Sequence, residues 1–156
     1  MGQAAPRVIT LHPGDVALGL RGDRLQTLLG SCVAIVLTDP RRTVGTMCHI
    51  VHSRSAEQAG SSSCAYGDMA MKRMIELLQA HAISVSRCEA YVYGGGNMFP
   101  HLVSGPSVGD CNAQWALDAL EAMGVGVISV DLGGAVYRQL SWTVGPESPH
   151  TVAIPL

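Results

Sequence analysis

The segment Cys32–Thr38 constrains the fold of this chain more than any other, because it is apolar on both of its alternating faces. In an extended strand, successive side chains point to opposite sides. One side of this segment reads Cys-Ala-Val and the other reads Val-Ile-Leu. A strand of this kind is covered on both faces, so we expect a layered core rather than a single sheet that faces water.

The rest of the chain reads as short strands with two helices between them. Apolar runs bounded by turn residues predict further strands, over Val8–Leu11, Val16–Leu20, Thr43–Val51, Cys88–Tyr93, Gly126–Asp131, Ala135–Trp142 and Thr151–Pro155. Apolar residues at helical spacing predict helices over Asp68–Ala80 and Asn112–Met123. Because strands outnumber helices, we expect an α/β or α+β layered domain.

Length and charge exclude several classes of protein. The 156 residues suit one domain spanning residues 1–156. Lys and Arg together number 10 against 12 Asp and Glu, so no basic surplus exists to neutralise nucleic-acid phosphates. No apolar run reaches the ~18–20 residues that span a bilayer, and the N-terminus lacks a secretory pattern. We therefore expect a cytoplasmic protein that neither binds nucleic acid nor inserts into a membrane.

The five cysteines contain no CxxC motif and do not fit a disulfide framework. Cys48 and His49 are neighbours, so in a strand they point to opposite faces and cannot share a metal ion. We expect no metal site. Cys48, Cys88 and Cys111 stand in apolar stretches and are expected to be core thiols.

A predicted hairpin brings a cysteine and a histidine together. The sequence Asp-Pro-Arg-Arg predicts a tight turn between two strands. A turn centred on Pro40–Arg41 places Thr38 opposite Thr43. The same register places Cys32 opposite His49, and directly opposed side chains share a face. A bulge of one residue would move His49 to the other face.

This pairing suggests nucleophilic chemistry at Cys32. A neighbouring His can lower the pKa of a Cys. The Gly30-Ser31 turn before the strand leaves backbone N–H groups near the sulfur, which can form an oxyanion hole. The competing interpretation is that Cys32 and His49 simply pack in the core.

A glycine-rich loop is expected beside this site. Its residues, Gly94, Gly95, Gly96 and Asn97, follow a predicted strand. Glycines allow a positive φ or the close approach of another backbone. The Lys and the Ser or Thr of a P-loop are absent. We therefore expect a structural loop next to the site rather than a phosphate-binding loop.

Several short motifs together resemble the chemoreceptor glutamine deamidase family, CheD, over about residues 8–145. The matching segments are Leu29–Ala34, Met47–His49, Tyr66–Asp68 with Ala70 and Met71, Gly94–Phe99, Val108 and Gly109 with Asn112, and Asp131, Gly133 and Gly134 with Arg138. The last of these resembles the family's hairpin between two strands. The resemblance implies mixed sheets in layers with flanking helices, similar to cytotoxic necrotising factor-type cysteine deamidases.

The resemblance also implies an enzyme that hydrolyses glutamine side chains of methyl-accepting chemotaxis receptors to glutamate, without a cofactor. Family members use a cysteine, a histidine and a threonine six residues before the cysteine. Cys32 and His49 match, whereas Gln26 stands at the threonine position and Thr27 follows it. We favour Thr27 as the third residue, because a small hydroxyl can both donate and accept a hydrogen bond. Gln26 remains the alternative.

The partners implied by the resemblance are the cytoplasmic helices of these receptors and a CheC-type phosphatase. An alternative function is a non-catalytic chemotaxis adaptor that binds receptors, such a phosphatase, or both. An adaptor has no need of Cys32 and His49, so we favour the enzyme.

Overall fold

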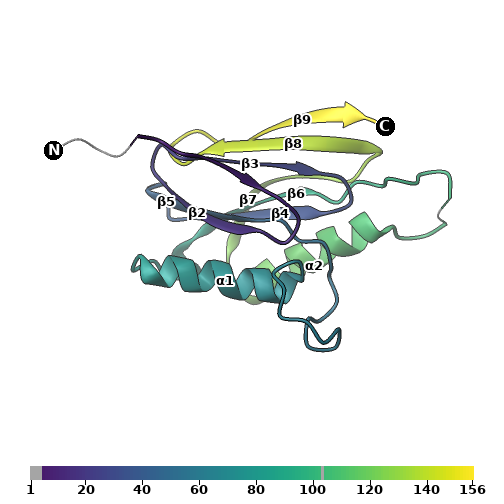
Figure 1. The fold of residues 1–156 in the computed structure, drawn as a ribbon, viewed down its shortest axis with the longest axis horizontal. Coiled ribbons are helices and arrows are strands. Elements are labelled where there is room, and N and C mark those ends of the chain that lie inside the picture. Colours follow the sequence, from purple (N-terminus) through teal and green to yellow (C-terminus); the bar gives the residue numbers. More distant parts are fainter. Residues whose placement is uncertain (1–4, 103) are drawn as a thin grey trace.

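The computed structural model describes residues 5–102 and 104–156, which form two β-sheets and two helices in three layers (Figure 1). The strands are β1 (Val8–Leu11), β2 (Val16–Leu20), β3 (Arg24–Leu29), β4 (Val33–Thr38), β5 (Val44–Cys48), β6 (Glu89–Gly94), β7 (Gly126–Leu132), β8 (Val136–Thr143) and β9 (His150–Pro155). The helices are α1 (Gly67–Ala80) and α2 (Val108–Ala122), and a 3₁₀ turn, η1, spans Val85–Arg87. Among the described residues, no helix is long and apolar enough to cross a bilayer.

Two mixed sheets pack face to face. One has the strand order β1-β3-β8-β9, and the other has the order β2-β5-β4-β6-β7. Strand β1 runs parallel to β3 and β6 runs parallel to β7, whereas all other neighbours are antiparallel. Helices α1 and α2 cover the outer face of the five-stranded sheet (Figure 1). This confirms the layered α+β arrangement predicted from the sequence.

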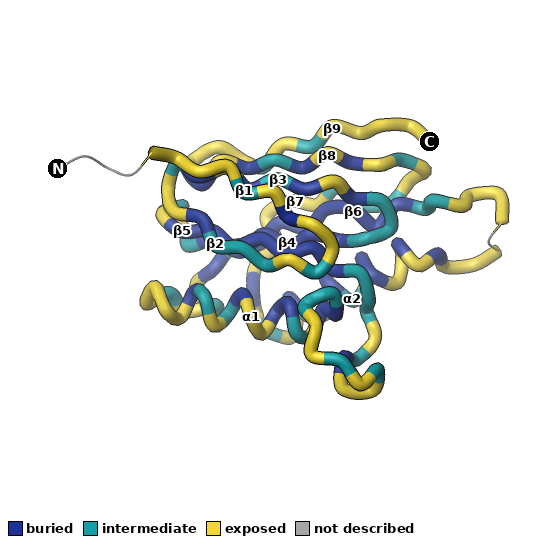
Figure 2. The backbone as a smooth tube through the Cα atoms, in the orientation of Figure 1, coloured by how far each residue is buried: buried dark blue, intermediate teal, exposed yellow. Residues whose placement is uncertain are grey.

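Strand β4 lies in the middle of the layers, as its apolar pattern predicts. All six of its residues are buried, and dark blue runs through the centre of Figure 2. Ala34 and Val36 face the other sheet. Val33 and Ile35 face the helices. The core is therefore divided by this sheet into an inter-sheet half and a helix half.

Two elements differ from the prediction. Strand β3 was not predicted at all, yet its alternating Leu25, Thr27 and Leu29 are buried between the sheets. Helix α2 begins at Val108 rather than Asn112. Its start is set by a capping box, in which Ser107 accepts from the Asp110 N–H and the Asp110 carboxylate accepts from the Ser107 N–H.

The predicted register of the β4–β5 hairpin is wrong by two residues. Thr38 pairs with Gly45 instead of Thr43. The loop is wider than predicted because the Asp39 carboxylate accepts hydrogen bonds from the N–H groups of Thr43 and Val44. An even offset preserves the face on which each side chain lies.

Further along the hairpin, Val33 and Ile50 exchange both backbone hydrogen bonds. His49 therefore lies diagonal to Cys32 on the inter-sheet face, rather than directly opposite. A diagonal neighbour in an antiparallel pair is still within reach of a long or aromatic side chain.

The connection that follows β7 is not a hairpin. Strand β7 belongs to the five-stranded sheet and β8 to the four-stranded sheet, so Gly133 and Gly134 carry the chain from one layer to the other. The buried Arg138 stabilises this crossover. Its guanidinium donates to the carbonyls of Gly133 and Gly94 and to the Asp131 carboxylate.

Candidate active site

A threonine from one sheet meets a histidine from the other in the inter-sheet layer. Thr27 Oγ1 lies 2.7 Å from His49 Nδ1 and 2.8 Å from the Leu11 carbonyl oxygen. All three residues are buried. Thr27 is brought there by the alternation of β3, which turns Leu25, Thr27 and Leu29 toward the five-stranded sheet.

The contact with Leu11 fixes the direction of the hydrogen bond between Thr27 and His49. A threonine hydroxyl has one proton, and a carbonyl oxygen can only accept. The proton of Thr27 therefore goes to Leu11, and Thr27 Oγ1 must accept from a protonated Nδ1 of His49. A neutral His49 then carries its lone pair on Nε2, which makes Nε2 the nitrogen available as a base.

Burial keeps the cysteine and the histidine uncharged. It raises the pKa of the half-buried Cys32 thiol above its ordinary value. Burial also lowers the pKa of His49 to about 4, while the nearby Asp15 carboxylate opposes this shift. The expectation that His49 lowers the pKa of Cys32 is therefore wrong for the resting protein, because removal from water disfavours both charged forms.

Within the described residues, Cys32 Sγ makes no hydrogen bond to His49. Catalytic hydrogen bonds are often long in a protein without substrate. The arrangement can therefore serve a reaction in which the thiol loses its proton to His49 Nε2 as it attacks, rather than before.

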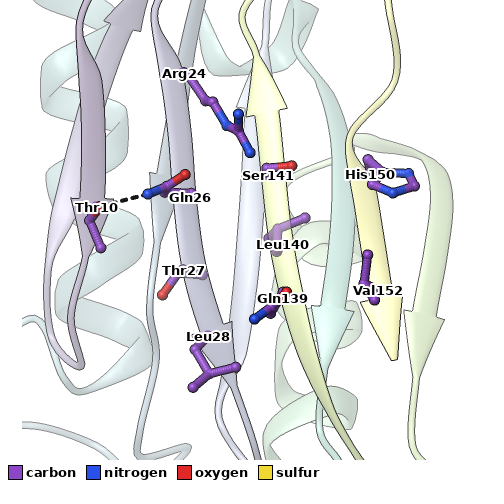
Figure 3. Close-up of a pocket in the computed structure, with 10 residues that line it drawn as sticks. All are labelled: Thr10, Arg24, Gln26, Thr27, Leu28, Gln139, Leu140, Ser141, His150 and Val152. Atoms are coloured by element: carbon purple, nitrogen blue, oxygen red, sulfur yellow. Dashed lines mark hydrogen bonds between the residues drawn. The ribbon is translucent and has the colours of Figure 1, made fainter. Parts of the chain in front are cut away.

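Gln26 lies on the opposite face of the four-stranded sheet. Its Nε2 donates to Thr10 Oγ1 across β1 and β3, as Figure 3 shows. That face forms a cavity of about 400 Å³ that contains no cysteine. Because Gln26 and Thr27 are adjacent in a strand, only Thr27 can reach His49.

The glycine loop holds the turn that precedes Cys32. The Gly95 N–H donates to the Cys32 carbonyl at 2.9 Å, and the Gly96 N–H donates to the Gly30 carbonyl at 2.9 Å. A side chain at Gly94 would occupy the position of the Cys32 carbonyl oxygen. Gly94, which has φ 108°, therefore allows the close backbone approach that the loop requires.

Two backbone donors lie beside the sulfur, the N–H groups of Ser31 and Cys32. Among the described residues, neither the Ser31 N–H nor the Cys32 N–H has a hydrogen-bond acceptor. Such N–H groups next to a nucleophile can bind an oxyanion.

Asn97 contributes to the loop rather than to the Cys32 turn. Its side-chain oxygen accepts from the Phe99 N–H, and its own N–H donates to the Gly134 carbonyl. A cavity of about 130 Å³ lies between this loop, Ser31 and the start of α2. Ser31, which precedes Cys32, lines this cavity.

Among the described residues, the other cysteines make no side-chain hydrogen bond to Thr27, Cys32 or His49. Cys48 faces the helix layer and is fully buried, and burial raises its pKa to about 12. Cys88 is also buried, in agreement with its apolar surroundings in the sequence. Cys111 is exposed on α2, so the expectation that it is a core thiol is wrong. It lies on the side of α2 that faces solvent rather than the sheet.

Three groups that support the candidate site were not assigned a role from the sequence. The Leu11 carbonyl is a backbone atom and has no sequence signal. Asn112 and Arg138 stand in recognisable motifs, but their contacts with residues some 60 to 80 and 44 positions away depend on tertiary structure.

The chain is similar to known proteins of one family. Residues 51–146 match the family described as CheD chemotactic sensory transduction. The chain is 38% identical over 143 residues to the probable chemoreceptor glutamine deamidase CheD 2 of Albidiferax ferrireducens, covering 89% of this chain and 83% of that protein. It is 34% identical over 127 residues to the probable chemoreceptor glutamine deamidase CheD of Methanococcus vannielii, covering 81% and 82% respectively. For the protein of the same name from Maridesulfovibrio salexigens, the identity is 32% over 147 residues, covering 88% and 86%.

Proposed function

Because the chain belongs to the CheD family of chemotactic sensory transduction proteins, we propose that it is a glutamine deamidase acting on methyl-accepting chemotaxis receptors. The observation that carries this proposal is the hydrogen bond from His49 Nδ1 to Thr27, on the face of the sheet that also bears Cys32. It leaves His49 Nε2 free to act as a base toward the thiol. No cofactor takes part in the proposed reaction.

The first half of the reaction forms a thioester. The Cys32 thiol gives its proton to His49 Nε2 as the sulfur attacks the side-chain carbonyl carbon of a glutamine. The resulting oxyanion is stabilised by the free N–H groups of Ser31 and Cys32. His49 then returns the proton to the amide nitrogen, and the carbon–nitrogen bond breaks to release ammonia.

The second half regenerates the enzyme. His49 Nε2 takes a proton from water, whose oxygen attacks the thioester carbon. The carbon–sulfur bond then breaks, and the thiolate recovers the proton from His49. The balance is glutamine plus water to glutamate plus ammonia. Each turnover adds one negative charge to the receptor, which can shift its conformational equilibrium.

We extend the proposal to location and partners. The substrate helices would be the cytoplasmic helices of the receptor, so the protein would act in the cytoplasm. A CheC-type phosphatase is a further proposed partner. A binding assay between the purified chain and such a phosphatase would test it.

The experiment that tests the proposed function measures ammonia release. The purified chain is incubated with the cytoplasmic fragment of a chemoreceptor, and binding of the two proteins is measured in parallel. Ammonia released in proportion to enzyme supports the deamidase. Binding without any ammonia would contradict it and favour the adaptor.

A further inference from the structure

The peptide bond that joins Ser31 to Cys32 is held at its carbonyl end by a side chain from another layer. Asn112 Nδ2 donates to the Ser31 carbonyl at 3.1 Å and to the Val51 carbonyl at 3.2 Å. Asn112 lies in the second turn of α2 and is 1% exposed. Both amide protons of this side chain are therefore used, one on each segment of the active site.

These two contacts lie just beyond the point where the segments of β4 and β5 stop pairing with each other. Val33 and Ile50 form the last backbone pair between the two segments. Beyond that pair, the N–H groups of Val51 and His52 turn away and donate to the Ala65 carbonyl instead. Asn112 therefore gives the Ser31 carbonyl the hydrogen bond that the His52 N–H would have donated in a continuing ladder.

Within the part of the chain that the structure describes, the glycine loop leaves the N–H end of the same peptide without an acceptor. In a regular antiparallel ladder, Cys32 would exchange two hydrogen bonds with Gly95. Only one forms, from the Gly95 N–H to the Cys32 carbonyl. Gly94 and Gly95 have φ of 108° and 63°, and the Gly95 carbonyl lies against Gly109 in α2.

The geometry of the peptide bond connects these two ends. The Ser31–Cys32 peptide is trans, so its C=O and N–H point in opposite directions. A donor that fixes the Ser31 carbonyl thereby also fixes the direction of the Cys32 N–H. Hydrogen bonding at the carbonyl also polarises the peptide and strengthens its N–H as a donor.

We propose that Asn112 is the positioning residue of the oxyanion hole, acting through the Ser31–Cys32 peptide. This inference rests on the proposed deamidase function and deepens it. Asn112 acts through the backbone and does not touch the substrate. It sets the direction of a backbone donor that stabilises the tetrahedral intermediate, and it leaves the Cys32–His49 pair, which the Val33–Ile50 ladder anchors, unchanged.

The test compares Asn112→Ala with Leu120→Ala, a matched control that removes a fully buried side chain from the same helix. Three quantities are measured for each: the melting temperature, kcat and KM on a receptor fragment, and the rate of Cys32 alkylation by iodoacetamide. Alkylation requires the thiol but no oxyanion hole. We expect Asn112→Ala to lower kcat by ~10-fold to 100-fold, because removing an oxyanion donor outright costs about 100-fold or more. KM and the alkylation rate should stay within twofold of wild type.

Other results would overturn the inference. These are a wild-type kcat in folded Asn112→Ala, an equal fall of kcat in Leu120→Ala, or an alkylation rate that falls together with kcat. If Asn112→Ala does not fold, Asn112→Leu, which keeps most of the side-chain volume but has no donor, is judged by the same criteria. Failure of the proposed function is distinguishable, because the wild-type protein would then release no ammonia at all.

Discussion

Thr27 accepts a hydrogen bond from His49 Nδ1 at 2.7 Å while its own proton goes to the Leu11 carbonyl. The two side chains come from different sheets, so the packing of the layers determines the orientation of the imidazole. A third group that fixes the tautomer and ring of a catalytic histidine has the same role as the acidic member of a serine protease triad.

Replacing Thr27 should lower turnover without removing the nucleophile. Thr27→Val keeps the shape of the side chain but leaves His49 Nδ1 without an acceptor. We expect kcat/KM to fall by ~10-fold or more, which corresponds to about 1.4 kcal/mol of transition-state stabilisation. Thr27→Ser should restore most of the activity. Gln26→Thr, on the outer face, is the control and should leave kcat/KM unchanged or raise it. A wild-type rate in Thr27→Val would show that the hydrogen bond is not needed.

Removing the Cys32 sulfur should abolish deamidation and leave the fold intact. The side chain is only half-buried, so Cys32→Ala creates little cavity, and circular dichroism should match wild type. Cys111→Ala is the matched control, because this thiol is exposed on α2. It should retain wild-type turnover. Glutamate formation by Cys32→Ala would exclude the thioester mechanism.

The acid limit of activity should lie well below the ordinary range of a histidine. Burial lowers the pKa of His49 to about 4, against about 6.5 for an unperturbed imidazole. The base thus stays unprotonated through mildly acidic solution. We expect kcat/KM to remain near its plateau at pH 6 and to fall as the pH approaches 4. Half-maximal kcat/KM near pH 6.5 would be the opposite outcome.

The lowered pKa of His49 should also make the free energy of unfolding depend on pH. Between pH 6.5 and 4 the unfolded state binds a proton at His49 that the native state does not. The free energy of unfolding therefore falls as the pH falls through this window, by about 3 kcal/mol in full. His49→Gln should remove most of this dependence in urea unfolding at several pH values.

Substitution by alanine should have different effects on kcat at two glycines that have similar φ angles. Gly95 has φ 63°, and a Cβ there would lie 2.7 Å from the Gly109 carbonyl oxygen. Gly124 has φ 69° but open space around it. Gly124→Ala should cost about 1–2 kcal/mol of stability and no activity. Gly95→Ala should also displace the loop from α2 and lower kcat by ~10-fold or more, because the loop leaves the Cys32 N–H free. Equal kcat values in the two variants would show that the loop does not contribute to catalysis.

The sequence predicted the layers and most strands because apolar alternation depends only on local residues. The doubly apolar Cys32–Thr38 segment indicated a strand covered on both sides, and β4 is that strand. It did not reveal β3, because Thr27 interrupts an otherwise apolar inner face. The residue that hides the strand from a hydrophobicity pattern is the residue that contacts His49.

The register and the supporting contacts could not be predicted from local patterns. The length of the hairpin loop depends on which N–H groups donate hydrogen bonds to the Asp39 carboxylate. Several types of turn were compatible with the same residues. The roles of Asn112 and Arg138 depend on tertiary contacts over long sequence separations. Neither kind of information is contained in residue spacing.

If Cys32, with His49 held by Thr27, converts receptor glutamine to glutamate, the change in mass is detectable on the receptor itself. Peptide-resolved mass spectrometry is applied to a chemoreceptor cytoplasmic fragment after incubation with wild-type protein and, side by side, with Cys32→Ala. We expect a mass increase of one unit at specific glutamines with the wild-type protein and none with Cys32→Ala. Unchanged glutamines in both samples, or the same conversion in both, would contradict this expectation.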